Sequence, residues 1–305
     1  MRRYLLSSLF QSVIVLLGVL FLVFFMVRLT GDPARAMLAR EATPEQVAEF
    51  RHRMGFDRPL VVQFIDFASR AIFGDFGNSL NYRLPALPLV LERLPYTLYL
   101  ASMALVMAVA VAIPLGLIGG ANPNSTLDLI GRGVGLLGQT VPTFWLALVM
   151  IVVFAVWLRW FPTSGSDGAT AIIMPAFALS LGTMGRLVRL TRSSVLEIMG
   201  EDYIRTARSK GLADRLIFFR HALKNAAIPL VSVTTIQFGY MLGGSVIIES
   251  VFAWPGLGRL AADSIAIRDF PLVQAIAFFT SLIVIALTVL SDLLYALLDP
   301  RIRYE

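Results

Sequence analysis

Residues that could do catalytic chemistry are few and scattered along this chain of 305 residues. There is no cysteine, and the two histidines, His52 and His221, lie far apart in the sequence. The motifs of phosphate-binding loops (Gly-x-x-x-x-Gly-Lys-Ser/Thr), zinc proteases (His-Glu-x-x-His) and serine hydrolases (Gly-x-Ser-x-Gly) do not occur. His52 stands between two arginines with no metal-ligand spacing around it, so a surface position is predicted. The sequence predicts no enzyme, no bound cofactor and no metal site.

A densely charged stretch, from Gly200 to Pro229, separates two apolar segments. Tyr203, Ile204 and Ala207 fall on one side of a predicted short helix, and Gly211 interrupts the pattern, because glycine allows a change of chain direction. A second helix is predicted beyond the glycine, with the apolar stripe Leu212, Leu216, Phe219 and Leu223. The charges could form a solvated face near anionic lipid. The two apolar stripes favour a cytoplasmic partner protein that covers them.

Membrane helices must position this stretch, because 57% of the residues are hydrophobic and only 15% are charged. Soluble proteins carry about 25% charged residues, and about 20 apolar residues span a bilayer as a helix. Six uncharged runs of at least 18 residues predict six spans: Tyr4–Val27, Leu94–Leu127, Gly133–Leu158, Gly168–Gly185, Asn225–Ile248 and Phe270–Ser291. The first run is too long for a signal peptide and is predicted to be a retained helix.

The placement of Lys and Arg predicts the orientation. Six spans put the N-terminus, residues 121–132, residues 186–224 and the tail on one side, with fourteen Lys and Arg, against three in the opposite short loops. The positive-inside rule therefore places both termini in the cytoplasm. The loop at 28–93 is near-neutral and too long to count. This distribution of the +6 net charge argues against a nucleic-acid partner.

The long external loop is predicted to fold into a small cap. Thr43 is a predicted N-cap, Pro44 takes the first helical position and Glu45 lies in the first turn. A second amphipathic segment is expected over 60–73, followed by a glycine-bounded turn at 74–80.

One feature of the spans is open to alternative interpretations. Pro142 predicts either a kink that helps helices pack or a flexible helix beside a pathway. Glycines in the second and third spans predict close helix–helix approach, and they lie at positions 116, 119, 120, 131, 133, 135 and 138. Trp157 and Trp160 are predicted to be interfacial anchors.

The segment Gly243–Gln274 is predicted to turn at Trp254-Pro255-Gly256 and to form an external re-entrant or interfacial piece. Glu249, Asp263 and Asp269 could meet a polar substrate there. Pairing of these acids with Arg259 and Arg268 is the favoured alternative.

No series of acidic residues within the spans suggests a proton relay, and no inverted repeat of broken helices is evident. A self-contained carrier or channel is therefore disfavoured, and a membrane-bound enzyme or scaffold lacks catalytic clusters. A bundle without its own energy source is predicted to be a subunit.

Eight motifs resemble those of the inner-membrane permease subunits of bacterial ABC importers, in the dipeptide/oligopeptide/nickel branch. They are Gly31-Asp32-Pro33, DFGNSL at 75–80, VPTFW at 141–145, YIRTARSKG at 203–211, RHALKNAAIP at 220–229, ESVFAWPGLGR at 249–259, RDFPLVQ at 268–274 and LDPRIRY at 298–304. The resemblance implies an all-α polytopic membrane protein with six transmembrane helices, both termini cytoplasmic, a large external loop after helix 1 and a cytoplasmic coupling helix between helices 4 and 5. The expected parts are an N-terminal helix at 1–30, an external cap at 31–93, a five-helix core at 94–300 with its coupling loop at 190–228, and a tail at 301–305.

The resemblance also implies that the loop docks on an ATPase subunit. Ala207 and Gly211 match the general importer pattern of Glu-Ala-Ala, three residues and Gly, whereas its glutamate and later proline are absent, as in the peptide branch. His221 then becomes a packing residue. The implied coupling residues are Tyr203, Ile204, Arg205, Thr206, Ala207, Arg208, Lys210 and Gly211. The implied external gate or binding-protein face is Glu249, Trp254, Pro255, Gly256, Asp263 and Asp269.

By this resemblance the chain forms half of a translocation pathway in the bacterial inner membrane and works by alternating access. The expected partners are a second, similar permease, two cytoplasmic ATPases that use ATP and Mg, and a periplasmic or lipid-anchored substrate-binding protein. A permease homodimer is the alternative. Di- or oligopeptides are the expected cargo, with nickel chelates and glutathione as alternatives.

Overall fold

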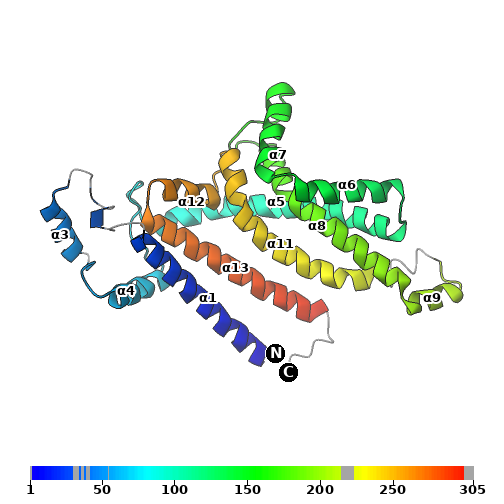
Figure 1. Ribbon diagram of the computed structural model, residues 1–305, viewed down its shortest axis with the longest axis horizontal. Helices are drawn as coiled ribbons and strands as arrows, with labels where there is room; N and C mark the ends of the chain where they lie inside the picture. Colours follow the sequence, from blue (N-terminus) through cyan, green and yellow to red (C-terminus); the bar gives the residue numbers. More distant parts are fainter. Residues whose placement is uncertain are drawn as a thin grey trace. The chain divides into compact units, whose positions relative to one another are not determined.

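The computed structural model describes residues 2–29, 34–35, 38, 42–53, 55–213 and 223–298. These residues form helices joined by turns, with an isolated bridge between Asn78 and Pro85, so the all-α prediction is confirmed for them. The helices in chain order (Figure 1) are α1 (Arg2–Leu29), α3 (Pro44–Arg53), α4 (Leu60–Ile72), α5 (Ala86–Ala121), α6 (Thr126–Thr140), α7 (Thr143–Met150), the π-helix η1 (Ile151–Trp157), α8 (Ile173–Gly200), α9 (Asp202–Ser209), α11 (Leu223–Val251), α12 (Leu257–Ala266) and α13 (Phe270–Leu298).

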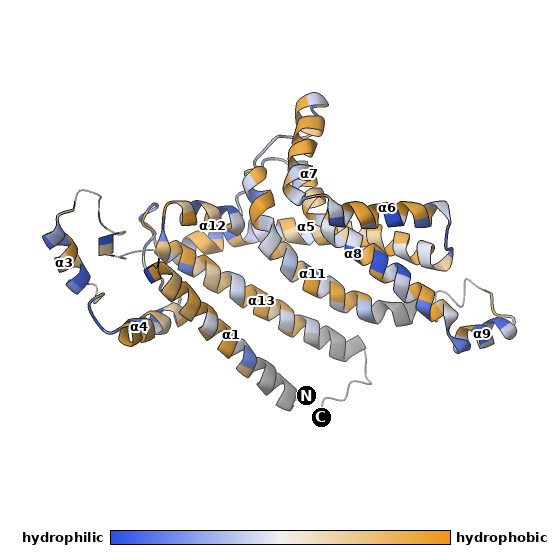
Figure 2. Cartoon of the chain, viewed as in Figure 1, coloured by the Kyte–Doolittle hydropathy of each residue, from blue (hydrophilic) through white to orange (hydrophobic). Residues whose placement is uncertain are grey.

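Four helices in the described part of the chain are long and apolar enough to cross a membrane. They are α1 over Phe10–Leu29, α5, α11 over Pro229–Val251 and α13 over Phe270–Ser291. The bent pair Thr126–Thr140 and Thr143–Trp157 makes a fifth if it is counted as one span. Figure 2 shows α1 and α13 as mostly hydrophobic and α3 and α9 as mostly hydrophilic, as the charge pattern predicts.

The third predicted span, Gly133–Leu158, is broken rather than kinked. The axes of α6 and of the α7–η1 segment differ by 106°. Pro142 lacks a backbone N–H group and disfavours helical geometry in the residue before it, and Val141 is extended, with ψ of 118°. Both interpretations of Pro142 assumed one continuous helix, and that assumption was wrong.

The fourth predicted span also differs, because its helix does not end at Arg186. α8 continues to Gly200. The residues between these two positions include many strong helix formers and no proline, so the first charge ends the apolar run without ending the helix. The segment predicted to be cytoplasmic is therefore partly a continuation of α8.

The described residues divide into two compact units, one of 2–95 and 260–286 and the other of 96–259 and 287–298, with the gaps given above. In the first unit α4 packs against α1 through aromatic rings. The Phe64 ring centroid lies 5.7 Å from that of Phe21 and 5.4 Å from that of Phe24, and Phe67 lies 5.7 Å from Phe24. The two pairs that involve Phe64 are edge-to-face, and such pairs stabilise packing beyond the burial of apolar area.

The loop after α1 has the local structure that its sequence predicts. Thr43 caps α3, since its Oγ1 accepts from the Gln46 N–H at 3.3 Å while the Gln46 side chain accepts from the Thr43 N–H. His52 is exposed, and its Nδ1 lies 2.6 Å from Asp57 Oδ2, a hydrogen bond that lowers the pKa of the Asp57 carboxyl group. Gly74 and Gly77 turn the chain with positive φ angles of 81° and 84°.

In the second unit α8 packs against α6 on one side and α11 on the other (Figure 1). The approach of α6 is close because glycines lie at the contact. A Cβ atom at Gly138 would overlap the carbonyl oxygen of Leu181 and lie 3.0 Å from the Cα of Gly185. Gly116 and Gly120 of α5 face α8 as closely, which confirms the predicted role of these glycines. Gly133 has no atom within 4 Å of its Cβ position and takes no part in this packing.

We expect Gly138→Ala to lower the free energy of unfolding by about 1–3 kcal/mol, because the added methyl group forces α6 away from α8. The matched control is Gly133→Ala in the same helix, which adds the same group in open space and improves helix propensity. Thermal unfolding of the purified variants in detergent measures the difference. Equal midpoints for the two variants would contradict the close contact.

Candidate functional site

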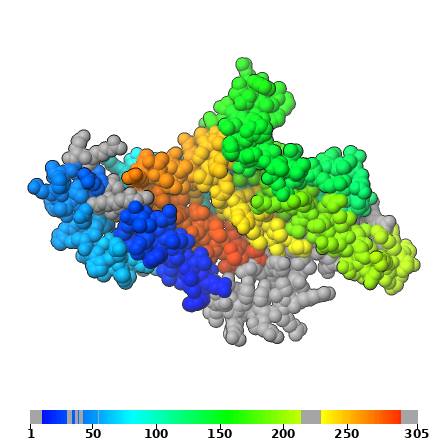
Figure 3. Space-filling model, in the orientation of Figure 1, coloured from blue at the N-terminus to red at the C-terminus, as the bar shows by residue number. Residues whose placement is uncertain are grey.

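α9 is the short helix predicted within the charged segment, and it follows directly on the end of α8. The side chain of Ile204 is fully buried within the chain, Ala207 is half-buried and Tyr203 is 42% exposed. Of the three apolar side chains expected to face a partner, Ile204 is buried within its own chain in this structure and anchors α9 there. Arg205, Thr206, Arg208 and Lys210 are exposed, and Figure 3 shows α9 at the surface.

The predicted change of direction at Gly211 is a helix-terminating motif. Gly211 has a φ of 78°, its N–H donates to the Arg208 carbonyl at 2.9 Å, and the Leu212 N–H donates to the Ala207 carbonyl at 3.3 Å. This is the Schellman arrangement, in which a left-handed residue satisfies the last carbonyl groups of a helix. The second helix predicted after Gly211, its stripe from Leu216 onward and the packing role of His221 lie outside the described residues or side chains.

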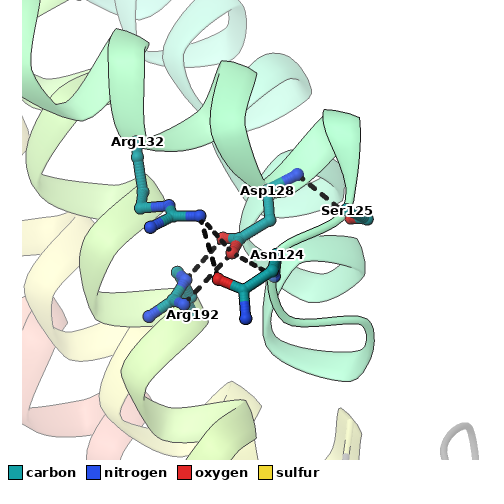
Figure 4. Close-up of polar contacts among 5 residues, drawn as sticks. All are labelled: Asn124, Ser125, Asp128, Arg132 and Arg192. Carbon is teal, nitrogen blue, oxygen red and sulfur yellow. Dashed lines mark hydrogen bonds and ion pairs between the residues drawn. The ribbon is translucent and has the colours of Figure 1, made fainter.

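A buried carboxylate ties α8 to the turn between α5 and α6 (Figure 4). The side chain of Asp128 is fully buried, and its Oδ1 lies 2.5 Å from Nε of Arg192. Its Oδ2 accepts from Nη2 of Arg192 at 3.2 Å and from the backbone N–H of Asn124 at 2.9 Å, and it forms an ion pair with Nη2 of Arg132 at 3.2 Å. Three hydrogen bonds and this ion pair offset the cost of burying the charge.

Sequence reasoning did not identify this cluster. The available signal was local: Ser125 caps α6 by accepting from the Asp128 N–H at 3.2 Å, a Ser-x-x-Asp pattern that marks a helix start. Nothing in the sequence indicated that Arg192, 64 residues further on, completes the site. The ion pair fixes α8 shortly before it leads into α9.

A second buried carboxylate lies in the motif ESVFAWPGLGR. Glu249 is fully buried, its Oε1 accepts from Thr97 Oγ1 at 2.7 Å, and its Oε2 accepts from the backbone N–H of Arg259 at 3.0 Å. Thr97 Oγ1 accepts in turn from the N–H of Leu257 at 2.8 Å. The carboxylate and the hydroxyl thus cap the N-terminus of α12, where the helix dipole favours negative charge. A Cβ atom on Gly256 would overlap this carboxylate.

Asp269, in the other unit, is a buried carboxylate that caps the N-terminus of α13, as Glu249 caps that of α12. Its Oδ1 accepts from the N–H of Leu272 at 3.4 Å, in the first turn of α13. Its Oδ2 accepts from Ser79 Oγ and from the Asn81 N–H, the latter at 3.3 Å. The DFGNSL and RDFPLVQ motifs, far apart in sequence, therefore meet at this buried carboxylate.

These contacts revise the predicted external residues. Glu249, Trp254, Gly256 and Asp269 are buried, so their side chains do not form an exposed face in this structure. Glu249 contacts Arg259, its predicted partner, by accepting a hydrogen bond from the backbone N–H of that residue. Pro255 is half-buried and Asp263 is exposed. Among the residues that the structure describes, no cluster of three or more His, Asp or Glu could hold a metal ion.

Two family models match the chain. The model described as binding-protein-dependent transport system inner membrane component matches residues 112–304, and the N-terminal model of the same system matches residues 1–101. Proteins named "Glutathione transport system permease protein GsiC" from Salmonella typhi and Escherichia coli K12 are 38% identical over 306 residues, covering all of both chains.

Solved structures have a similar fold over about two thirds of this chain. An inward-facing MetNI methionine ABC transporter chain aligns with a TM-score of 0.54 and 19% identity, over 69% of this chain and 96% of that one. A chain of an amino acid ABC transporter with histidines aligns with a TM-score of 0.55 and 19% identity, over 68% and 93%. At this identity the likeness bears on the fold alone.

We expect Asp128→Asn to lower the free energy of unfolding by about 2 kcal/mol, because two arginines lose their charged acceptor. Arg132→Gln is the matched control. It removes the more exposed of the two guanidinium groups, at 44% exposure against 25% for Arg192, and should have a smaller effect. Thermal unfolding in detergent measures both, and a larger loss for the control would overturn this assignment.

Proposed function

Because the chain belongs to the family of binding-protein-dependent transport system inner membrane components, as a permease subunit of an ABC importer, we propose that it forms half of the import pathway for a small peptide. The chain is a multi-pass inner-membrane protein and not an enzyme, since ATP hydrolysis belongs to a separate subunit. The family models and the identity to the glutathione permeases confirm the resemblance to the peptide and nickel branch that the motifs indicated. The full-length similarity to the glutathione permeases carries the proposal.

Glutathione or a di- or oligopeptide is the proposed cargo. Glutathione is itself a tripeptide, so the name of the similar permeases and the peptide-branch motifs favour one class of ligand. A nickel chelate is the alternative within the branch. The proposed assembly pairs this chain with a second permease and two ATPases that use ATP and Mg, and receives cargo from an external binding protein.

Six spans with both termini in the cytoplasm remain the proposed topology. The four apolar helices and the bent pair supply five, and the apolar first half of α8, before Arg186, supplies the sixth. The proposed boundaries are those of the predicted parts: the helix at 1–30, the cap at 31–93, the core at 94–300 and the tail at 301–305. Pro255 and Asp263 are proposed contacts of the external binding protein, because they are the less buried residues of the predicted set.

α9 is the proposed coupling helix. With Ile204 buried, the face offered to an ATPase consists of Tyr203, Thr206, Ala207 and Lys210, which are spaced as one side of a helix. Movement of a docked ATPase would pass through Ile204 into α8. The two permeases would then alternate between inward- and outward-open forms.

Uptake by the reconstituted importer tests the function. Proteoliposomes that hold both permeases and the ATPases, with binding protein outside, are supplied with labelled glutathione, dialanine or a nickel–histidine complex. ATP-dependent uptake of glutathione or dialanine supports the proposal, and uptake of nickel alone overturns the peptide assignment. Uptake by this chain without ATPases would show a self-contained carrier.

We expect Gly211→Val to leave membrane insertion intact and to uncouple ATP hydrolysis from uptake. The φ of 78° is strained for a β-branched residue, although the space around the glycine is open. The control is Gly211→Asn, because asparagine tolerates left-handed geometry and should retain most of the coupling. The measurement is cargo imported per ATP hydrolysed. Equal ratios for Gly211→Val and the parent would contradict the coupling role.

A further inference from the structure

Arg186 of α8 directly follows the apolar first half of that helix, has no ion-pair partner among the described residues and contacts a residue inside a candidate span. Arg186 is exposed in this chain, and its Nη1 donates to Oε1 of Gln237 at 3.1 Å. Gln237 belongs to the apolar span Pro229–Val251, about 12 Å along the helix axis from Pro229 at 1.5 Å per residue. An ionised side chain at such depth is costly unless it faces a water-filled cavity or a functional site.

Gln237 holds this arginine in place. Its side chain is 3% exposed, and Nε2 is the one buried side-chain polar atom without a hydrogen-bond partner in the described part of the chain. The amide cannot be turned to relieve this, because a guanidinium only donates and needs Oε1 as its acceptor. A buried amide with an unsatisfied N–H group therefore fixes the orientation of an exposed cation. Because unsatisfied buried donors are rare, this arrangement calls for an explanation.

The remaining N–H groups of Arg186 are available to an anion. A guanidinium carries five donors in a planar fork that matches a carboxylate, and Gln237 occupies one nitrogen. The hydrogen bond to Gln237 also keeps the side chain from extending to the lipid headgroups. Arg189, one turn further along α8, lies differently: its Cγ is 3.2 Å from the Cβ position of Gly135, on the α6 side.

We propose that Arg186, oriented by Gln237, is a binding position for the carboxylate group of the cargo within the translocation pathway. This inference rests on the proposed function, since a peptide or glutathione carries a free carboxylate. An exposed arginine could instead face the partner permease or the lipid surface. The test below distinguishes these two alternatives from a site in the translocation pathway.

Charge-selective labelling beside Arg186 tests the site without reference to the cargo. Tyr240, one helical turn from Gln237, is 65% exposed, and the chain has no native cysteine, so Tyr240→Cys places a single thiol there. The assembled importer, with cysteines removed from the other subunits, is treated with sulfonatoethyl (anionic) or trimethylammonioethyl (cationic) methanethiosulfonate. Mass spectrometry of this chain gives the two labelling rates.

We expect the anionic reagent to react faster, and Arg186→Gln to reduce the anion-to-cation ratio about tenfold, as removal of a nearby unit charge should. Arg186→Lys should keep the ratio, and the matched control Arg189→Gln should leave it unchanged. A ratio that does not respond to Arg186→Gln overturns the proposal. No labelling by either reagent, with or without ATP, also overturns it, because position 240 then faces lipid or protein.

Uptake provides the second measurement. In proteoliposomes that import glutathione or dialanine, Arg186→Gln should raise the KM for uptake at least tenfold, whereas ATP hydrolysis stimulated by the binding protein should persist. Unchanged uptake in Arg186→Gln overturns the carboxylate site and leaves the importer function intact. If the parent imports neither peptide, the proposed function fails. The labelling ratio then still decides whether Arg186 attracts anions.

Discussion

The close contact between α6 and α8 determines how the functional residues of the second unit are placed. Gly138 brings the backbone of α6 against the carbonyl group of Leu181, and side chains of ordinary size cannot enter this space. α8 then carries Arg186, Arg192 and, through Gly200, the short helix α9. Backbone atoms at glycine positions make the α6–α8 contact, so α8 has a fixed position against α6. The polar side chains that α8 carries are therefore also held in place.

Buried carboxylates hold the connections between helices. Asp128, Glu249 and Asp269 each accept hydrogen bonds at the start of a helix or in its first turn, and each also binds a residue distant in the sequence. A charge at a helix N-terminus is stabilised by the dipole and by the free N–H groups. These acids therefore join the turns to the helices. This structural role explains why acidic residues of the family motifs, such as Glu249 and Asp269, are buried.

Much of this arrangement could be predicted from the sequence. The apolar runs located α1, α5, α11 and α13, the Thr43 cap located α3, and Gly211 marked the end of α9, because each is a local property of the chain. The break at Pro142 and the length of α8 were not predicted, since charge-free runs report composition and not helix continuity. The partners of Asp128 and Arg186 lie 64 and 51 residues away, and only tertiary structure brings them together.

The four tryptophans give the chain two distinct classes of natural fluorophore. Trp145, Trp157 and Trp160 are 52%, 74% and 63% exposed in the isolated chain, whereas Trp254 is 2% exposed and donates its indole N–H to the carbonyl of Tyr96 at 3.0 Å. An aqueous quencher or a brominated lipid can reach the first three and not the fourth. Emission that survives quenching therefore comes from the turn between α11 and α12, so the native chain can report optically on this turn without an introduced label.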